Sequence, residues 1–181
     1  MVDFQAIQEK WQKKWKEEQI FEVDVDPQKE KFFITTPYPY ISGSLHIGHA
    51  RAVTEVDVFS RFLRMQGKNV LFPMAFHISG TPVLGISLAI QNGDEEKINL
   101  YREYVGSYVK DEKEVAKVVQ SFVDPWKIVE FFIPKMKEEY SRLGLGIDWR
   151  RSFSSGDVVH QKLVEWQFQK YKEKGYLVQG K

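Results

Sequence analysis

Between residues 37 and 49 the chain reads Pro37-Tyr38-Pro39-Tyr40-Ile41-Ser42-Gly43-Ser44-Leu45-His46-Ile47-Gly48-His49. The short apolar run Phe32-Phe33-Ile34 precedes this stretch, and a segment with helical patterning, residues 50–65, follows it. The order therefore predicts a strand, a loop rich in proline, glycine and serine, and then the N-terminus of a helix. Such a junction gathers backbone N–H groups and the positive end of a helix dipole, an arrangement that suits a phosphate group.

Two histidines, His46 and His49, stand in the first turn of the expected helix. Their spacing of three places both side chains on one helix face, from which imidazoles can donate hydrogen bonds to phosphate oxygens. Gly48 lies between them and, having no side chain, leaves room for a flat ligand to approach the backbone. Spacing alone is also compatible with two ordinary polar residues at a helix start. We expect no metal site, because only His77 is near enough in the sequence to supply a third ligand.

Two apolar runs flank the expected helix. Residues 31–36 are β-branched and aromatic, and residues 69–74 form a second short run bounded by a turn and a proline. The pattern predicts a βαβ unit with parallel strands and a right-handed connection. Ligands of such sheets bind at the carboxyl ends of the strands, so the 37–49 loop and the residues after Met74 should share one edge. Too few strand segments follow for a complete sheet, which indicates the front part of a larger α/β unit.

The expected organisation is a single unit, residues 1–181, made of four consecutive parts. These are an N-terminal helix and turn (1–30), the βαβ unit with its following helix (31–92), a helical excursion (93–145), and a return helix that leads to the start of a new strand (146–181).

Four local expectations accompany this organisation. The apolar stripe of the first helix should dock on the domain; it consists of Phe4, Ile7, Trp11 and Trp15. Pro134 should kink the helix expected at residues 126–143 or divide it in two. Residues 176–178, Tyr-Leu-Val, should begin a strand. The basic residues that follow the 37–49 loop should form a solvated helix face rather than an RNA patch; they are Arg61, Arg64 and Lys68.

The composition is that of an ordinary soluble globular protein, with 43% hydrophobic and 28% charged residues among the 181. A formal net charge of +1 provides no field that would draw in nucleic acid. The lack of cysteine excludes a disulfide framework and a thiolate metal site. No signal-peptide pattern and no apolar run of spanning length are present, so we expect a cytoplasmic location and no membrane partner. A half-sheet would expose an edge strand and an apolar face, which predicts marginal stability or self-association for the chain alone.

The stretch at residues 37–49 resembles the signature of class I aminoacyl-tRNA synthetases, whose hallmark is the string His-Ile-Gly-His. Residues 61–74 look like the helix and second strand of the leucine, isoleucine and valine subgroup. Residues 76–82, Phe-His-Ile-Ser-Gly-Thr-Pro, resemble the archaeal and eukaryotic-cytosolic leucyl-tRNA synthetases. Further similar strings are Gly146-Ile147-Asp148-Trp149, Glu165-Trp166-Gln167-Phe168 and Lys174-Gly175-Tyr176. The resemblance covers nearly the whole chain and implies the first half of a Rossmann-like, nucleotide-binding catalytic domain, in the N-terminal part of an archaeal-type leucyl-tRNA synthetase.

This resemblance also implies roles for individual residues. On the nucleotide side, His46 and His49 would contact the ATP phosphates and stabilise the transition state, Gly48 would lie under the adenine ring, and Gly43 would belong to the same ATP site. On the amino-acid side, the residues that would line the pocket are Tyr38, Tyr40 and His77. In the isoleucine enzyme and the bacterial leucine enzymes, an aspartate that holds the substrate ammonium occupies the position of His77. A structural residue that caps the next helix is the other reading of His77.

The activity implied by the resemblance is formation of leucyl-adenylate from leucine and ATP, accompanied by Mg²⁺, and then transfer to tRNA(Leu) through parts outside this chain. The second family signature, Lys-Met-Ser-Lys-Ser or a variant, does not occur in these 181 residues, so a C-terminal half or complementary chain would be needed. The alternative is a non-catalytic truncated paralog or half-enzyme that binds a nucleotide or a partner chain. A different nucleotidyltransferase with the same phosphate signature is a third possibility.

Overall fold

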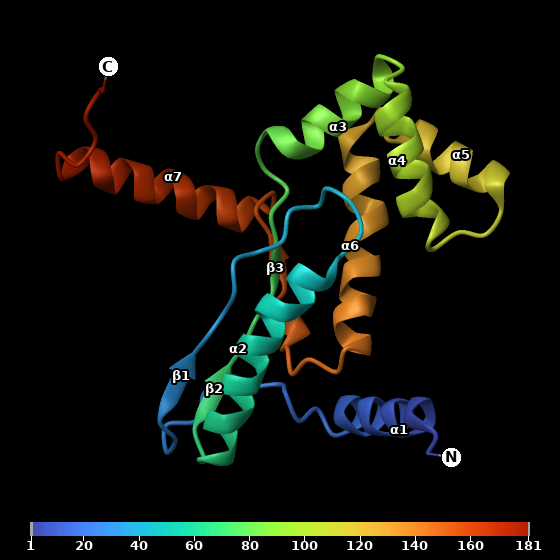
Figure 1. Cartoon of the computed structure of the whole chain (residues 1–181). Helices are drawn as coiled ribbons and strands as arrows, with labels where there is room; N and C mark the ends of the chain where they lie inside the picture. Colours follow the sequence, from blue (N-terminus) through green and yellow to red (C-terminus); the bar gives the residue numbers. More distant parts are fainter. Residues whose placement is uncertain (1, 181) are drawn as a thin grey trace.

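The computed structural model describes residues 2–180 and consists of helices arranged around two short strand pairs (Figure 1). The elements are, in chain order, α1 (Phe4–Glu17), β1 (Lys31–Phe33), α2 (Ile47–Met65), β2 (Asn69–Leu71), β3 (Ala75–Phe76), α3 (Thr81–Gln91), α4 (Glu95–Gly106), α5 (Glu112–Ser121), α6 (Pro125–Arg142), the 3-10 helix η1 (Trp149–Arg151), β4 (Phe153–Ser154) and α7 (Val158–Glu173).

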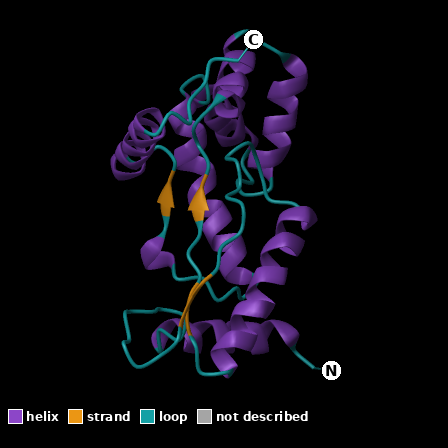
Figure 2. Cartoon of the chain, turned by 90° about the vertical axis from the view of Figure 1, so that its left-hand side faces the viewer, coloured by secondary structure: helices purple, strands orange, loops and turns teal. Residues whose placement is uncertain are grey.

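The predicted βαβ unit is confirmed. β1 pairs with β2 in parallel, in the register Lys31 to Asn69 and Phe33 to Leu71, and α2 forms the connection between them. A second parallel pair, β3 with β4, joins Ala75 to Phe153. Figure 2 shows the two pairs one above the other along the molecule. The strands are shorter than the apolar runs suggested, but the α/β class with an incomplete parallel sheet holds.

Two apolar clusters hold these elements together. The larger one lies among the helices α3–α6 and includes β3 and the start of the loop before α2, since both Ile41 and Phe76 belong to it. The smaller cluster lies beneath α2 and is built from Val53, Phe72, Met74, Tyr140, Leu145 and Ile147. Leu45 and Trp149 pack against both clusters, so the loop before α2 and the segment after α6 connect the two halves of the core.

The helix α6 runs without interruption through Pro134, so the expected division into two helices is not observed. Its buried residues recur every four positions and form one continuous stripe, namely Ile128, Phe132, Met136 and Tyr140. Because these four side chains are anchored in the core on both sides of the proline, packing outweighs the lost backbone hydrogen bond.

The apolar stripe of α1 docks only at its C-terminal end. Trp15 packs edge-on against Phe21, and its ring lies 3.3 Å from where a side chain on Gly144 would begin. Phe4 and Trp11, by contrast, are exposed. The expectation that the whole stripe docks is therefore wrong. Polar side chains make the other attachment of α1, since Gln8 and Gln12 donate to the Arg142 carbonyl at the end of α6, at the base of the molecule in Figure 1.

The expected strand at residues 176–178 is also wrong, since this segment has no regular structure. No strand within residues 2–180 lies beside it, and an unpaired strand leaves its backbone groups without partners. The preceding helix α7 forms as predicted, but none of its side chains is buried, and it extends away from α6 (Figure 1). Within residues 2–180 no helix combines the length and apolarity needed to cross a bilayer.

The basic residues of α2 are structural, which corrects the expectation of a solvated face. Arg61 donates to Asp57 at 2.7 Å and to the Gly144 carbonyl at 2.5 Å. Arg64 donates to the Gly146 carbonyl at 3.1 Å, and burial lowers the pKa of its guanidinium. Lys68, farther along, pairs with Glu30 at 2.6 Å. These side chains bind the segment after α6 and the turn before β1 rather than facing water.

Candidate functional site

The loop before α2 ends in a reciprocal cap made by the two histidines. His46 is the N-cap of α2, and its Nδ1 accepts a hydrogen bond from the Gly48 N–H at 3.1 Å. The His49 Nδ1 in turn accepts one from the backbone N–H of His46 at 3.3 Å. The two rings lie side by side, with centroids 4.0 Å apart. The predicted pairing of the histidines on one face of the helix start is confirmed.

This cap determines which ring nitrogens carry protons. Because each Nδ1 accepts a hydrogen bond, the network assigns the proton of each neutral ring to Nε2. Neither Nε2 has a hydrogen-bond partner within residues 2–180. Partial burial, and then the neighbouring His46, lower the pKa of His49, which favours its neutral form near pH 7. The helix start therefore offers two adjacent N–H donors from uncharged rings.

Gly48 has a structural reason to be glycine as well as the expected functional one. A Cβ at this position would lie 2.8 Å from Cε1 of His46, so a side chain would push the ring out of the cap. Gly43, five residues earlier, has φ +147 and is buried. This left-handed conformation disfavours residues with a side chain.

The residues after Met74 meet the loop, as the shared edge predicted. Tyr40 and His77 form an isolated parallel bridge, in which the His77 N–H donates to the Pro39 carbonyl at 2.9 Å. The rings of Tyr40 and His77 lie 4.2 Å apart. His77 does not cap the next helix, because the N-cap of α3 is Gly80. Tyr38 is turned toward a different neighbour and packs edge-on against Phe153, with centroids 5.4 Å apart.

A turn between β4 and α7, which the sequence analysis did not single out, supports this edge. The Ser155 Oγ accepts hydrogen bonds from the backbone N–H groups of Ile78 at 2.9 Å and Ser79 at 3.0 Å. A Cβ on Gly156 would lie 2.3 Å from Ile78. The string Ser-Ser-Gly at residues 154–156 marks a turn, but only the pairing of β3 with β4 reveals that it holds the backbone after His77.

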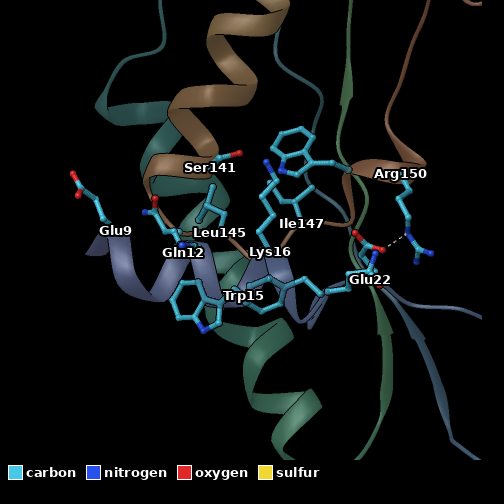
Figure 3. Close-up of a pocket in the computed structure, with 14 residues that line it drawn as sticks. Glu9, Gln12, Trp15, Lys16, Glu22, Ser141, Leu145, Ile147 and Arg150 are labelled. Atoms are coloured by element: carbon cyan, nitrogen blue, oxygen red, sulfur yellow. Dashed lines mark ion pairs between the residues drawn. The ribbon is translucent and has the colours of Figure 1, made fainter. Parts of the chain in front are cut away.

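A cavity of about 630 Å³ lies elsewhere, between α1 and residues 144–150 (Figure 3). Trp15 and Ile147 form part of its apolar lining, and an ion pair between Arg150 and Glu22, at 3.2 Å, closes one side. None of the predicted site residues lines this cavity. We therefore assign the candidate site to the open edge beside the 37–49 loop. The criterion is the hydrogen-bonding chemistry of its side chains and not the presence of a cavity.

Comparisons with known proteins identify the family of the chain. The family model described as tRNA synthetases class I (I, L, M and V) matches residues 10–181. A leucine–tRNA ligase of Staphylothermus marinus is 47% identical over 97% of this chain, and one of Pyrococcus horikoshii is 46% identical over 99%. The chain spans 18% of the length of each of these relatives.

A solved structure shares the fold. It is the ternary complex of LeuRS from Agrobacterium radiobacter K84 with tRNA and LeuAMS, with a TM-score of 0.63 and 24% identity over 97% of this chain and 18% of that one. The match of residues 10–181 and the predicted signature at residues 46–49 lead to one assignment. The chain belongs to the class I tRNA synthetase family, and it resembles the leading part of archaeal leucine–tRNA ligases.

Proposed function

We propose that the chain forms one wall of a leucyl-adenylate-forming active site. The observation that carries the proposal is the reciprocal cap, which leaves the Nε2–H groups of His46 and His49 adjacent at the start of a 19-residue helix. Two neutral donors beside a helix N-terminus suit an anion whose charge grows during the reaction. The similarity to leucine–tRNA ligases supports leucine and ATP as the substrates.

In the proposed reaction a carboxylate oxygen of leucine attacks the α-phosphorus of ATP. The bond from that phosphorus to the oxygen bridging to the β-phosphate breaks, and pyrophosphate leaves. The residues of this chain act by positioning and by charge stabilisation, since no covalent enzyme intermediate is required. His46 and His49 would donate to phosphate oxygens. Gly43 would belong to the same ATP site, and Gly48 would lie beneath the adenine.

The amino-acid side of the site would be formed by Tyr38, Tyr40 and His77. The contact between Tyr40 and His77, with ring centroids 4.2 Å apart, supports a shared pocket at the end of β3. An unprotonated imidazole nitrogen of His77 would accept one hydrogen bond from the substrate ammonium but would supply no opposite charge. The balancing carboxylate must then come from another residue.

Other participants lie outside the residues described. Residues 2–180 contain no group of three His, Cys, Asp or Glu side chains arranged to hold a metal ion, so in this proposal Mg²⁺ arrives bound to ATP. The lysine signature and the contacts with tRNA(Leu) would belong to a C-terminal half or complementary chain, because this chain spans only 18% of its relatives. We further infer that the protein works in the cytoplasm, where tRNA is charged.

The test is leucine-dependent exchange of pyrophosphate into ATP. We expect exchange when the 181-residue chain is combined with the remaining portion of a leucine–tRNA ligase relative, and little or none from the chain alone. His46→Ala should lower that exchange by about 100-fold or more, as the loss of a transition-state donor does. Glu55→Ala, an exposed position on the same helix, is the matched control and should leave the rate unchanged.

Two results would contradict the proposal. Absence of exchange under both conditions, with ATP still binding to the chain, would favour a non-catalytic nucleotide-binding half. Exchange that is indifferent to leucine would indicate another nucleotidyltransferase. Isoleucine and valine are measured beside leucine, because small differences in aliphatic size are worth only about 1–3 kcal/mol of discrimination.

A further inference from the structure

The helical excursion, residues 93–145, contacts the loop at residues 37–49, here called the phosphate loop, through two tyrosines of α4. Tyr101 is 3% exposed, and its hydroxyl donates a hydrogen bond to the Ser42 carbonyl at 2.5 Å. The ring of Tyr104 lies directly on Gly43, where an added Cβ would meet Cε2 at 2.6 Å. Both contacts join residues about 60 positions apart in the sequence.

The rings of both tyrosines pack within the excursion, so their positions are set by its core and not by the loop. The Tyr101 ring packs edge-on against Phe122 at 6.1 Å and Phe132 at 6.3 Å, which belong to α5's C-cap and to α6. Tyr104 packs on Tyr101 at 5.5 Å. Burial raises the pKa of Tyr101 far above the neutral range, so its hydroxyl remains a donor at any physiological pH.

Apolar contacts flank the two tyrosine contacts on both sides. Ile41, fully buried, belongs to the same core cluster as Tyr101, and Leu45 packs against that cluster. Ile41, Ser42, Gly43 and Leu45 therefore each contact α4 or the core cluster to which it belongs, within the five residues before the N-cap His46.

The Tyr101 hydrogen bond also fixes the direction of one backbone N–H. A trans peptide points its carbonyl and its N–H to opposite sides. With the Ser42 carbonyl turned toward α4, the Gly43 N–H points away from α4, and it has no hydrogen-bond partner within residues 2–180. A free backbone N–H three residues before the N-cap His46 is a further donor for the anion that the imidazoles would bind.

We propose that α4 is the positioning element of the phosphate loop. Tyr101 orients the peptide between Ser42 and Gly43 so that an N–H and not a carbonyl faces the phosphates, and Tyr104 holds Gly43 in its left-handed conformation. The consequence for ATP rests on the proposed function of the loop. Tyr101 and Tyr104 are positioning residues and touch no reacting atom.

Hydrogen exchange of the ligand-free 181-residue chain tests the positioning itself. Tyr101→Phe removes only the hydroxyl that binds Ser42. We expect the two hydrogen-bonded amides on either side of that contact, Ile41 (bonded to the His77 carbonyl) and His46 (bonded to the His49 Nδ1), to exchange about tenfold faster, the effect of losing one hydrogen bond. The matched control is Tyr104→Phe, which keeps the ring on Gly43 and removes a hydroxyl that has no hydrogen bond within residues 2–180; its exchange should equal that of the wild type. Unchanged exchange in Tyr101→Phe, or an equal rise throughout α2, would overturn the proposal.

Nucleotide affinities separate this proposal from the proposed function. Where the wild type binds ATP, Tyr101→Phe should weaken ATP about tenfold and leave adenosine unchanged, because only the phosphates would miss the Gly43 N–H. Faster loop exchange with an unchanged ratio of ATP to adenosine affinity would refute the role in phosphate binding. A wild type that binds no ATP, but whose loop is loosened by Tyr101→Phe, would refute the proposed function and retain the positioning.

Discussion

The two ends of α2 are built on opposite principles. Toward its C-terminus the helix buries charge: Asp57 accepts hydrogen bonds from Arg61 and from the Gly146 N–H, the latter at 2.6 Å. At its N-terminus the helix presents polar groups to the open side, with both Nε2–H groups of His46 and His49 lacking partners within the described residues. One end pairs its polar groups within the fold, and the other keeps two ring N–H groups without a partner in the part of the chain that the structure describes.

The difference indicates how α2 can be held in position although the sheet beside it is incomplete. The buried end joins α2 to residues 144–148, where Asp148 is fully buried and accepts hydrogen bonds from Arg150 and the Val23 N–H. These bonds hold the pKa of Asp148 below its ordinary value, although burial alone would raise it. Charge that is fully paired costs little there, while removing one partner leaves an uncompensated group. The buried end thereby fixes α2 to the segment after α6.

Asp57→Ala should break the buried end and give the largest effect. It removes the acceptor of the Gly146 N–H and the carboxylate partner of Arg61, which keeps only its bond to the Gly144 carbonyl. We therefore expect the free energy of unfolding to fall by about 3 kcal/mol. Urea denaturation followed by circular dichroism measures the change. Glu55→Ala, which breaks only the exposed pair with Arg51, should cost less than about 0.5 kcal/mol. Similar losses in both variants would mean that α2 has no distinct buried end.

The sequence predicted the open end better than the buried one. The spacing of His46 and His49, the glycines and the strand before them are local features, so the helix start and its shared edge with His77 could be read directly. The buried end depends on contacts between positions more than 80 residues apart, such as Arg61 with Gly144. A run of arginines on a helix looks the same whether it faces water or a distant loop, which is why the solvated face was predicted wrongly.

The same limit explains the remaining differences. Tyr101 and Tyr104 lie in a charged segment whose pattern predicts a helix but not its neighbour, so their contacts with the phosphate loop were not foreseen. The pattern of α7 is likewise that of an amphipathic helix, yet no residue of it is buried. Periodicity identifies a face for packing, and only tertiary structure identifies what packs on it.

Gly48→Ala should sharpen the comparison by disturbing the open end without unfolding the helix. The new Cβ would displace the His46 ring and lose its cap, a cost of about 1 kcal/mol. Alanine in a helix gains about as much over glycine, so the free energy of unfolding should change by less than about 0.5 kcal/mol. We expect the ¹⁵N chemical shifts of His46 to show that Nδ1 no longer accepts a hydrogen bond.

The control for that variant is Gly85→Ala in α3, where an added Cβ meets no atom within 4 Å. Only the helix propensity changes there, so the protein should become more stable by about 0.5–1 kcal/mol. If Gly48→Ala were stabilised to the same extent and left the His46 resonances unchanged, the cap would not depend on the glycine.

Acidification should disturb the open end alone, and with the smallest effect. Because the pKa of His49 in the folded chain lies below its ordinary value of 6.5, the unfolded chain takes up the proton first as the pH falls. The contribution of neutral His49 to stability is therefore complete above about pH 6.5 and is lost as the pH decreases through the lower, folded pKa. A protonated Nδ1 also cannot accept the hydrogen bond from the His46 N–H, so the His49 ring becomes charged and loses the cap in the same step.

His49→Gln isolates this effect, since glutamine at the third helical position can keep the capping bond and does not titrate. Denaturation curves between about pH 7.5 and 5, a range that starts above the ordinary histidine pKa and ends well below it, should show the wild type losing stability relative to His49→Gln. Parallel curves for the two proteins would mean that the cap tolerates a charged ring, and that the neutral Nε2–H donors proposed for the phosphate site are not enforced by the fold.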